Sequence, residues 1–284
     1  MEGFLVSKTL FCACELGVFE QLHESQRPLS VSELAVSLGC SEDGTERLLN
    51  ACVSLELLNA NTDPHGTVVY SNTEMSSVFL TKSSPTSLFH SIEYSSRTIY
   101  LCWHYLNDAV REGKNQYEKA FGVNSKDLFE ALYRSDEEMV KFMHLMNSIW
   151  NICGRDVVTA FDLSPFRCIC DLGGDFFKDE LPQADLYILA RILHDWTDQR
   201  SVELLAKIYH SCRPGGGVLL VESLLYEDDS GPLTAQLYSL NMLVQTEGRE
   251  RKASDYSRLL NAAGFTHVHI HHTGKIYDAI LARK

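Results

Sequence analysis

The chain has 284 residues, 45% of them hydrophobic and 22% charged, which is typical of a globular protein long enough for two domains. Its 38 acidic and 25 basic residues give a net charge of −13, which excludes a general electrostatic attraction to nucleic acid or to anionic lipid. No apolar run approaches the ~20 residues that cross a membrane, and residues 1–4 lack the basic region of a signal peptide. We therefore expect a cytoplasmic protein with no nucleic-acid or membrane partner.

Nine cysteines are scattered along the chain, most of them inside apolar runs where a thiol behaves as a small hydrophobic side chain. This usage predicts a reducing compartment and no disulfide framework. Cys168 and Cys170 alternate on one predicted strand, but no second pair of ligands accompanies them at zinc-site spacing. We therefore expect no metal ion.

Residues 1–95 have the order of a winged-helix-like domain. Ser30 and Glu33 fit a capping box at the start of a short helix that ends at Gly39. Apolar spacing and turn residues predict three helices and a short strand, over residues 4–22, 30–38, 41–58 and 67–70. A further helix is expected to begin at Asn72.

Winged helices often bind DNA, so that function has to be weighed here. The segment that would enter the major groove carries Glu42, Asp43, Glu46 and Glu56 against Arg47 alone. Phosphate neutralisation needs Lys and Arg on that face, so the charge balance disfavours transcriptional regulation. Protein–protein contact, as a dimerisation domain, is the better prediction for residues 1–95.

Residues 96–150 are predicted to form a helical linker, within a helical and aromatic-rich stretch that starts near Ser84. Most of these aromatic side chains are expected to fill the core. Tyr133 and Trp150 come last, just before the next domain, and are candidates to roof a cofactor pocket.

From residue 151 to 284 strands alternate with helices, and the strands are continuous runs of Val, Ile and Leu, as in a mainly parallel sheet covered on both faces. A closing hairpin is expected near the C-terminus. Ligands of such sheets bind beyond the carboxyl ends of the strands, beside glycine turns. Here one strand ends in Asp171-Leu172-Gly173-Gly174 and the next runs into His194 and Asp195. A further strand is expected to begin at Val218, after residues 213–217, and to end in Glu222.

Seven motifs then occur in a fixed order, and together they are specific. They are Asp171-Leu172-Gly173-Gly174, Gly174-Asp175-Phe176-Phe177, Arg191-x-x-His194-Asp195-Trp196, Arg213-Pro214-Gly215-Gly216-Gly217, Glu222-Ser223, Glu247-Gly248-Arg249-Glu250-Arg251 and Ala262-Ala263-Gly264-Phe265. The chain resembles the S-adenosylmethionine-dependent O-methyltransferases of the plant caffeate and hydroxyindole type, over essentially its whole length. The resemblance implies a winged-helix-like dimerisation domain followed by a Rossmann-like methyltransferase domain.

The resemblance also implies an activity, namely transfer of a methyl group from S-adenosylmethionine to the hydroxyl of a small aromatic compound such as a hydroxyindole. His194 matches the family's catalytic base, and Glu222 and Glu250 match carboxylates that orient the imidazole and favour its protonated form. Three positions match substrate contacts: Asp195, Asn241 and Gln245. Seven match cofactor contacts: Tyr133, Trp150, Gly173, Gly174, Asp175, Phe176 and Arg191.

One part of the family pattern is absent at Gly174–Asp175, where the glycine turn runs directly into Asp175-Phe176-Phe177. A crossover to a parallel strand needs at least about a dozen residues. By comparison with the family, on the order of fifty residues are missing, about two βα units that include the acid expected to bind the ribose. We therefore expect weakened S-adenosylmethionine binding. The alternative function is that of a non-catalytic isoform that pairs, as a heterodimer instead of a homodimer, with a full-length subunit.

Overall fold

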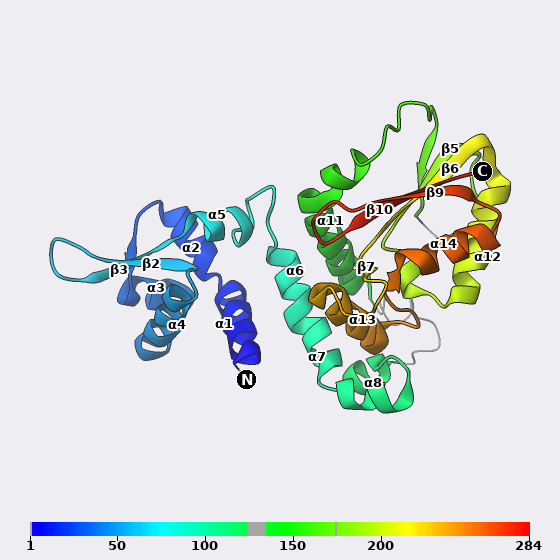
Figure 1. Cartoon of the computed structure of the whole chain (residues 1–284). Coiled ribbons are helices and arrows are strands. Elements are labelled where there is room, and N and C mark those ends of the chain that lie inside the picture. The colour runs from blue at the N-terminus through cyan, green and yellow to red at the C-terminus, as the bar shows by residue number, and fades with distance from the viewer. Residues whose placement is uncertain (1, 124–134, 174) are drawn as a thin grey trace. The chain divides into compact units, whose positions relative to one another are not determined.

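The computed structural model of the chain is shown in Figure 1, and it describes residues 2–123, 135–173 and 175–284. Contacts divide the chain into two units, one of Met1–Leu101 with Ser135–Ile152 and one of Cys102–Arg134 with Cys153–Lys284. The predicted linker 96–150 is thus shared between both units. Tyr133 and Gly174 lie outside the described residues.

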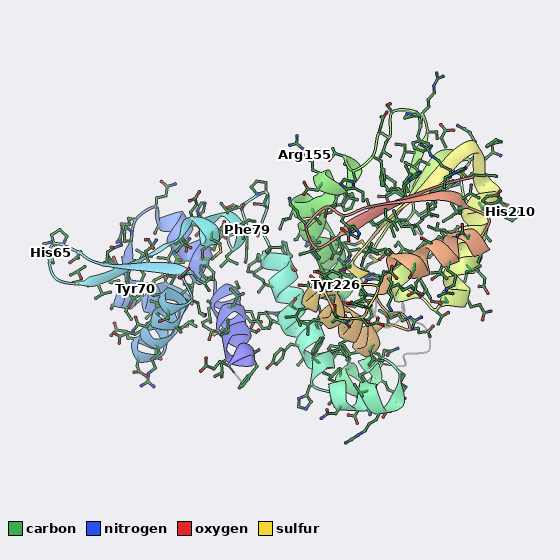
Figure 2. All side chains as sticks on the ribbon, viewed as in Figure 1. His65, Tyr70, Phe79, Arg155, His210 and Tyr226 are labelled. Carbon is green, nitrogen blue, oxygen red and sulfur yellow. The ribbon has the colours of Figure 1, made fainter. Side chains whose placement is uncertain are left out.

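The first unit follows the predicted winged-helix order. Its elements are α1 (Gly3–Leu16), α2 (Val18–Ser25), β1 (Leu29–Ser30), α3 (Val31–Leu38), α4 (Glu42–Ser54), β2 (Leu58–Thr62), β3 (Val68–Asn72), α5 (Glu74–Phe79) and α6 (Phe89–Tyr94). Strands β2 and β3 form an antiparallel hairpin, and β1 pairs with the other edge of β3. Tyr70, labelled in Figure 2, points from β3 toward α4, where its hydroxyl donates to Oδ1 of Asn50 (2.8 Å).

Local start and stop signals in this unit are confirmed, whereas two predicted helix lengths are wrong. Ser30 and Glu33 form the capping box, and α3 ends at Gly39 in the left-handed conformation (φ 66°). The predicted helix 4–22 is broken at Gly17, whose φ of 85° ends α1 and lets α2 start in a new direction. The predicted helix 41–58 ends at Ser54, because Leu58 pairs with Asn72 in the hairpin instead.

The aromatic-rich stretch is helical in the residues that the structure describes. It contains a π-helix (Ser95–Ile99), α7 (Tyr100–Trp103), α8 (Leu106–Glu112), α9 (Tyr117–Phe121) and α11 (Asp136–Val158). None of the described helices is both long enough and apolar enough to cross a lipid bilayer.

The second unit is built on a five-stranded sheet with the order β4-β5-β6-β10-β9. Its strands are β4 (Ile169–Asp171), β5 (Ala184–Ala190), β6 (Cys212–Glu222), β9 (Thr266–His271) and β10 (Asp278–Arg283). The first three run parallel, and β10 is antiparallel to both β6 and β9, so the predicted sheet and its closing hairpin are confirmed. Helices α12 (Asp198–Ser211) and α14 (Ala253–Ala262) pack on one face through Leu205, Ile208, Leu259 and Leu260.

The strand predicted to begin at Val218 begins earlier, because residues 213–217 with their three glycines already lie within the long strand β6. A side chain at Gly216 would overlap the carbonyl oxygen of Asp185 on β5, and one at Gly217 would overlap that of Ala282 on β10. Glycine therefore serves close approach of three strands here, in a segment whose composition resembles a turn.

Candidate active site

The candidate site lies where strands β5 and β6 end. These strands are parallel neighbours, so the residues that follow them meet at one edge of the sheet. After β5 the chain turns at Arg191, whose φ is 58° and whose N–H donates to the carbonyl of Val221 (2.9 Å). A short 3-10 helix, η2 (Leu193–Asp195), then carries His194 toward Glu222, the last residue of β6.

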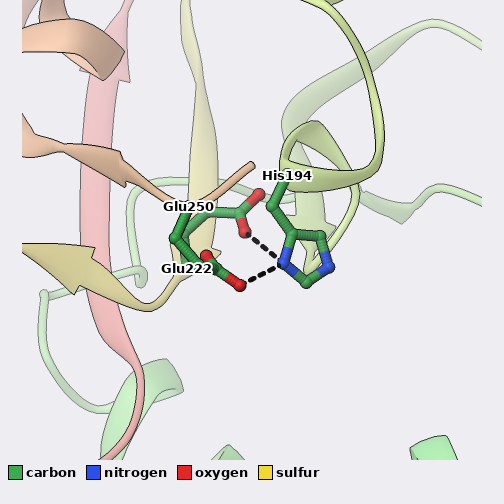
Figure 3. Close-up of side chains that lie close together, drawn as sticks. All are labelled: His194, Glu222 and Glu250. Atoms are coloured by element: carbon green, nitrogen blue, oxygen red, sulfur yellow. Dashed lines mark hydrogen bonds and ion pairs between the residues drawn. The ribbon is translucent and has the colours of Figure 1, made fainter. Parts of the chain in front are cut away.

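His194, Glu222 and Glu250 form a buried cluster, with 4%, 0% and 2% of their surfaces exposed (Figure 3). Nδ1 of His194 lies 2.8 Å from Oε1 of Glu250 and 3.9 Å from Oε2 of Glu222. An ionised carboxylate only accepts hydrogen bonds, so Nδ1 carries a hydrogen and its N–H donates a hydrogen bond to Oε1 of Glu250. In the neutral imidazole this leaves Nε2 as the proton acceptor, 3.6 Å from Oδ1 of Asp195.

The electrostatics of the cluster favour a charged imidazole. Burial lowers the pKa of His194, but the carboxylates of Glu250, Asp195 and Glu222 outweigh burial and raise that pKa to about 9. Burial also raises the pKa of Glu222 to about 7, against the opposing effect of the His194 charge. The site therefore stabilises an imidazolium ion, the form that His194 takes once it has accepted a proton.

The same three side chains could also hold a metal ion. One ligand atom from each lies within 4.8 Å of the other two, and this is the one such group of three or more found among the described residues. In the geometry observed, Glu250 orients the imidazole through one hydrogen bond, whereas Oε2 of Glu222 and Oε2 of Glu250 are buried without a hydrogen-bond partner among the described residues.

Asn241 and Gln245 lie one turn apart on α13 (Leu233–Gln245), where Asn241 is half-buried and Gln245 is buried. Oδ1 of Asn241 accepts from Nε1 of Trp103 (2.8 Å), and Oε1 of Gln245 accepts from the hydroxyl of Tyr117 (3.2 Å). These bonds fix the orientation of both amides. Sequence reasoning missed these two aromatic partners, because contacts across more than 120 positions leave no local signal.

Comparison with known proteins shows the family of the chain. Residues 1–82 match the O-methyltransferase dimerisation domain, and residues 103–175 and 173–266 match the O-methyltransferase domain. Acetylserotonin O-methyltransferase of Gallus gallus is 56% identical over 329 aligned residues, covering 99% of this chain and 95% of the relative, and that of Homo sapiens is 49% identical with the same coverage. The crystal structure of human N-acetylserotonin methyltransferase in complex with S-adenosylmethionine superposes with a TM-score of 0.98 at 49% identity, covering 100% of this chain and 95% of that one.

The chain belongs to the S-adenosylmethionine-dependent O-methyltransferases. Its dimerisation domain is matched as one piece, whereas its methyltransferase domain is matched as two pieces that meet at residues 173–175. The 329 positions aligned with the Gallus gallus enzyme exceed the 284 residues of this chain by 45, so at least that many oppose a gap in it.

The remaining predicted cofactor residues of this methyltransferase are spread over several environments. Gly173 follows β4, and among the described residues, its chain neighbours aside, no heavy atom lies within 4 Å of the position that a Cβ would take there. Asp175 pairs with Lys178 (2.9 Å), and Phe176 is buried in the core. The guanidinium of Arg191 stacks on the ring of Tyr277 (5.2 Å). Trp150 lies in the first unit and is 37% exposed.

Proposed function

We propose that this chain transfers the methyl group of S-adenosylmethionine to the hydroxyl of N-acetylserotonin, giving melatonin, and that it does so in the cytoplasm as a homodimer. The substrate is suggested by the names of the relatives from Gallus gallus and Homo sapiens. The dimer is suggested by the match to the dimerisation domain, and the reducing compartment by nine free thiols. The observation that supports the chemistry best is the buried hydrogen bond between His194 and Glu250.

In this proposal Nε2 of neutral His194 accepts the proton of the substrate hydroxyl. A phenol-like hydroxyl has a pKa of ~10, and the pKa of His194 is raised to about 9, so the proton moves between groups of similar basicity. Glu250 holds the ring through Nδ1, and Glu222 adds a second negative charge to the developing imidazolium. Without these carboxylates, burial would make the imidazole a weaker base.

Asp195, Asn241 and Gln245 are proposed to orient the aromatic substrate. Few, well-placed polar groups set orientation in small-molecule sites. Asp195 lies beside Nε2 of His194, and the two amides are held on one face of α13 by aromatic partners. Because both amide oxygens already accept a hydrogen bond, the NH₂ groups are the donors proposed to meet an acceptor on the substrate.

Residues that follow β4, together with Arg191 after β5, are the proposed contacts of S-adenosylmethionine. The open backbone at Gly173 allows close approach of a ligand, and Asp175, Phe176 and Arg191 offer a carboxylate, an aromatic ring and a guanidinium. Gly174, Tyr133 and Trp150 complete the proposed set. When bound, the cofactor supplies an electrophilic methyl group on a positively charged sulfur.

Weakened cofactor binding is part of the proposal, because at least 45 aligned positions of the relative have no counterpart here. Each lost charge-assisted hydrogen bond costs about 1.5–3 kcal/mol. Titration calorimetry of the chain beside the Gallus gallus enzyme tests this directly. Equal affinities would refute it.

Methyl transfer itself is tested by incubating the full-length chain with isotopically labelled S-adenosylmethionine and N-acetylserotonin and measuring the product by mass spectrometry. His194→Gln should lower the rate at least about 100-fold, the contribution typical of a general base. His210→Gln is the matched control, because His210 is an exposed histidine at the end of α12 (Figure 2). A His194→Gln rate equal to that of the control would contradict the assignment of the base.

The second candidate function is that of a non-catalytic isoform that pairs with a full-length subunit. It is favoured by one observation, that the dimerisation domain is matched without interruption while the methyltransferase domain is matched in two pieces. Co-purification with a tagged full-length relative, from a chain that shows no methyl transfer, would support it. Methyl transfer by the isolated chain would refute the non-catalytic role.

A further inference from the structure

The loop of residues 193–196, which carries His194, is hydrogen-bonded by the side chain of Arg251, a buried residue that is 1% exposed. Nη1 donates to the carbonyl of Leu193 (2.7 Å) and Nη2 donates to the carbonyl of Trp196 (2.6 Å). These two carbonyls bracket His194 and Asp195 in the chain. A planar guanidinium presents its donors in a rigid fork, so two simultaneous bonds fix the relative position of the two carbonyls.

The backbone at Gly248, three residues before Arg251, lies in close contact with the backbone of the loop. An added Cβ at this position would overlap the carbonyl oxygen of His194 and lie 2.6 Å from the carbonyl carbon of Asp195. Its N–H donates to Oγ1 of Thr246 (3.0 Å), which holds the turn in that place. Only glycine permits this approach, because every other residue carries the Cβ that would collide.

From the other side the loop is held by Glu222, whose Oε1 accepts from the N–H of Leu193 (3.0 Å). Glu250 lies between Gly248 and Arg251 in the chain and accepts from Nδ1 of His194. The segment of residues 248–251 thus supplies the carboxylate that orients the imidazole. It also supplies the two contacts, from Gly248 and Arg251, that fix the position of the loop backbone. A shift of the segment moves the carboxylate and the base relative to each other.

We propose that Arg251 and Gly248 are positioning residues for His194, which fix the loop of residues 193–196 so that the imidazole meets the carboxylate of Glu250. The inference rests on the proposed function of His194 as the base. Arg251 and Gly248 act through the backbone of the loop and touch neither substrate nor cofactor in this proposal.

A purely structural role for Arg251 is the competing explanation, because its Nε also donates to Oδ1 of Asp198 (2.9 Å). The chain contains a control for that role. Arg258 also donates to Asp198 (Oδ2, 3.0 Å), and its other described ion pair is with Asp255, so it contributes to the same ion-pair network without touching the loop carbonyls. Arg258→Met therefore removes an Asp198 partner and leaves both loop carbonyls paired.

The test compares Arg251→Met, Arg251→Lys and Gly248→Ala with Arg258→Met in the full-length chain. Displacement of a base by about 1 Å can cost about 100-fold in rate, so kcat should fall by about that factor in Arg251→Met and Gly248→Ala. The KM for the aromatic substrate should change little, because the loss falls on the transition state. Arg251→Lys should fold but should still show the lowered kcat, since a single ammonium group cannot donate to both loop carbonyls in the geometry of the guanidinium. Arg258→Met should keep the rate of the unmodified chain.

Titration of the His194 ring by NMR gives a readout that needs no turnover. In the unmodified chain the ring lies among the carboxylates of Glu222, Glu250 and Asp195, and in Arg251→Met and Gly248→Ala it should titrate closer to an ordinary histidine. If folded Arg251→Met keeps both the kcat and the His194 pKa of the unmodified chain, the proposal is overturned. It is also overturned if Arg258→Met changes both quantities as much as Arg251→Met does. If Arg251→Met does not fold, Gly248→Ala and Arg251→Lys decide by the same criteria. A chain without methyl transfer contradicts the proposed function alone, because the NMR titration still tests the positioning.

Discussion

Replacing Glu250 by Gln is the sharpest test of the electrostatics of the site. The substitution keeps the size of the side chain and an acceptor for Nδ1 of His194, which now lies 2.8 Å from Oε1, but removes the negative charge. A pKa raised from 6.5 to about 9 corresponds to a net preference for the imidazolium of about 3 kcal/mol. Three carboxylates, those of Glu250, Asp195 and Glu222, share this effect against burial, and Glu250 contributes most. Its removal should therefore lower the pKa of His194 by about one unit or more.

The assay is kcat/KM for the aromatic substrate as a function of pH. Neutral His194 is the working form, so in the unmodified chain the rate should rise with pH and level off above about 9. In Glu250→Gln the rising limb should move toward lower pH. The plateau should fall about tenfold, because the imidazolium formed in the transition state loses its nearest counter-charge. The two effects oppose each other at pH 7, so the loss should be larger on the plateau than at neutral pH.

Glu247→Gln is the matched control, because Glu247 lies in the same segment but is exposed to solvent. It should leave both the plateau and the rising limb in place. A rising limb that does not move in folded Glu250→Gln would refute the claim that this carboxylate sets the basicity of His194. NMR titration of the ring gives the same comparison where turnover is slow.

Two other substitutions probe the neighbouring parts of the site. Asn241→Leu should raise the KM for the substrate about tenfold and lower the free energy of unfolding by about 1–3 kcal/mol, because Nε1 of Trp103 loses its acceptor; steady-state kinetics and chemical denaturation measure the two effects. Lys207→Met should weaken S-adenosylmethionine binding at least several-fold in calorimetry, because Nζ of Lys207 ties down the turn after Gly174 by donating to the carbonyls of Phe176 (2.9 Å) and Asp179 (2.5 Å). An unchanged KM in the first case, or an unchanged affinity in the second, would contradict the corresponding role.

Local chemistry explains which elements could be predicted from the sequence. A capping box or a glycine in the left-handed conformation acts within one turn, so Ser30, Glu33 and Gly39 mark the ends of α3 correctly. Continuous apolar strands such as β5 can be predicted equally well from the sequence. Gly17 interrupts a run of apolar residues with helical spacing on both sides, and periodicity alone does not reveal such a break.

The support of the site could not be predicted in the same way. His194 and its carboxylates were found through family motifs, and the structure brings the three together as buried neighbours. The residues that hold the site in place are different in kind. Arg251 reaches the carbonyl of Leu193 across 58 positions, and Trp103 reaches Asn241 across 138. Such contacts arise from tertiary packing between segments far apart in the sequence, and no local pattern encodes them.

The junction at residues 173–175 separates two properties that usually occur together in a methyltransferase. Strand β4 is an edge strand three residues long with Ile169 46% exposed, and the two matched pieces of the methyltransferase domain meet at residues 173–175, directly after this strand. The base and its carboxylates depend instead on β5, β6 and the segment around Glu250, all of which are continuous in the chain. A chain with a His194 pKa near 9 by NMR and weak cofactor binding by calorimetry is therefore the expected combination. A His194 pKa near that of an ordinary histidine, together with tight cofactor binding, would contradict both expectations: that the carboxylates raise the basicity of His194 and that the cofactor site is weakened.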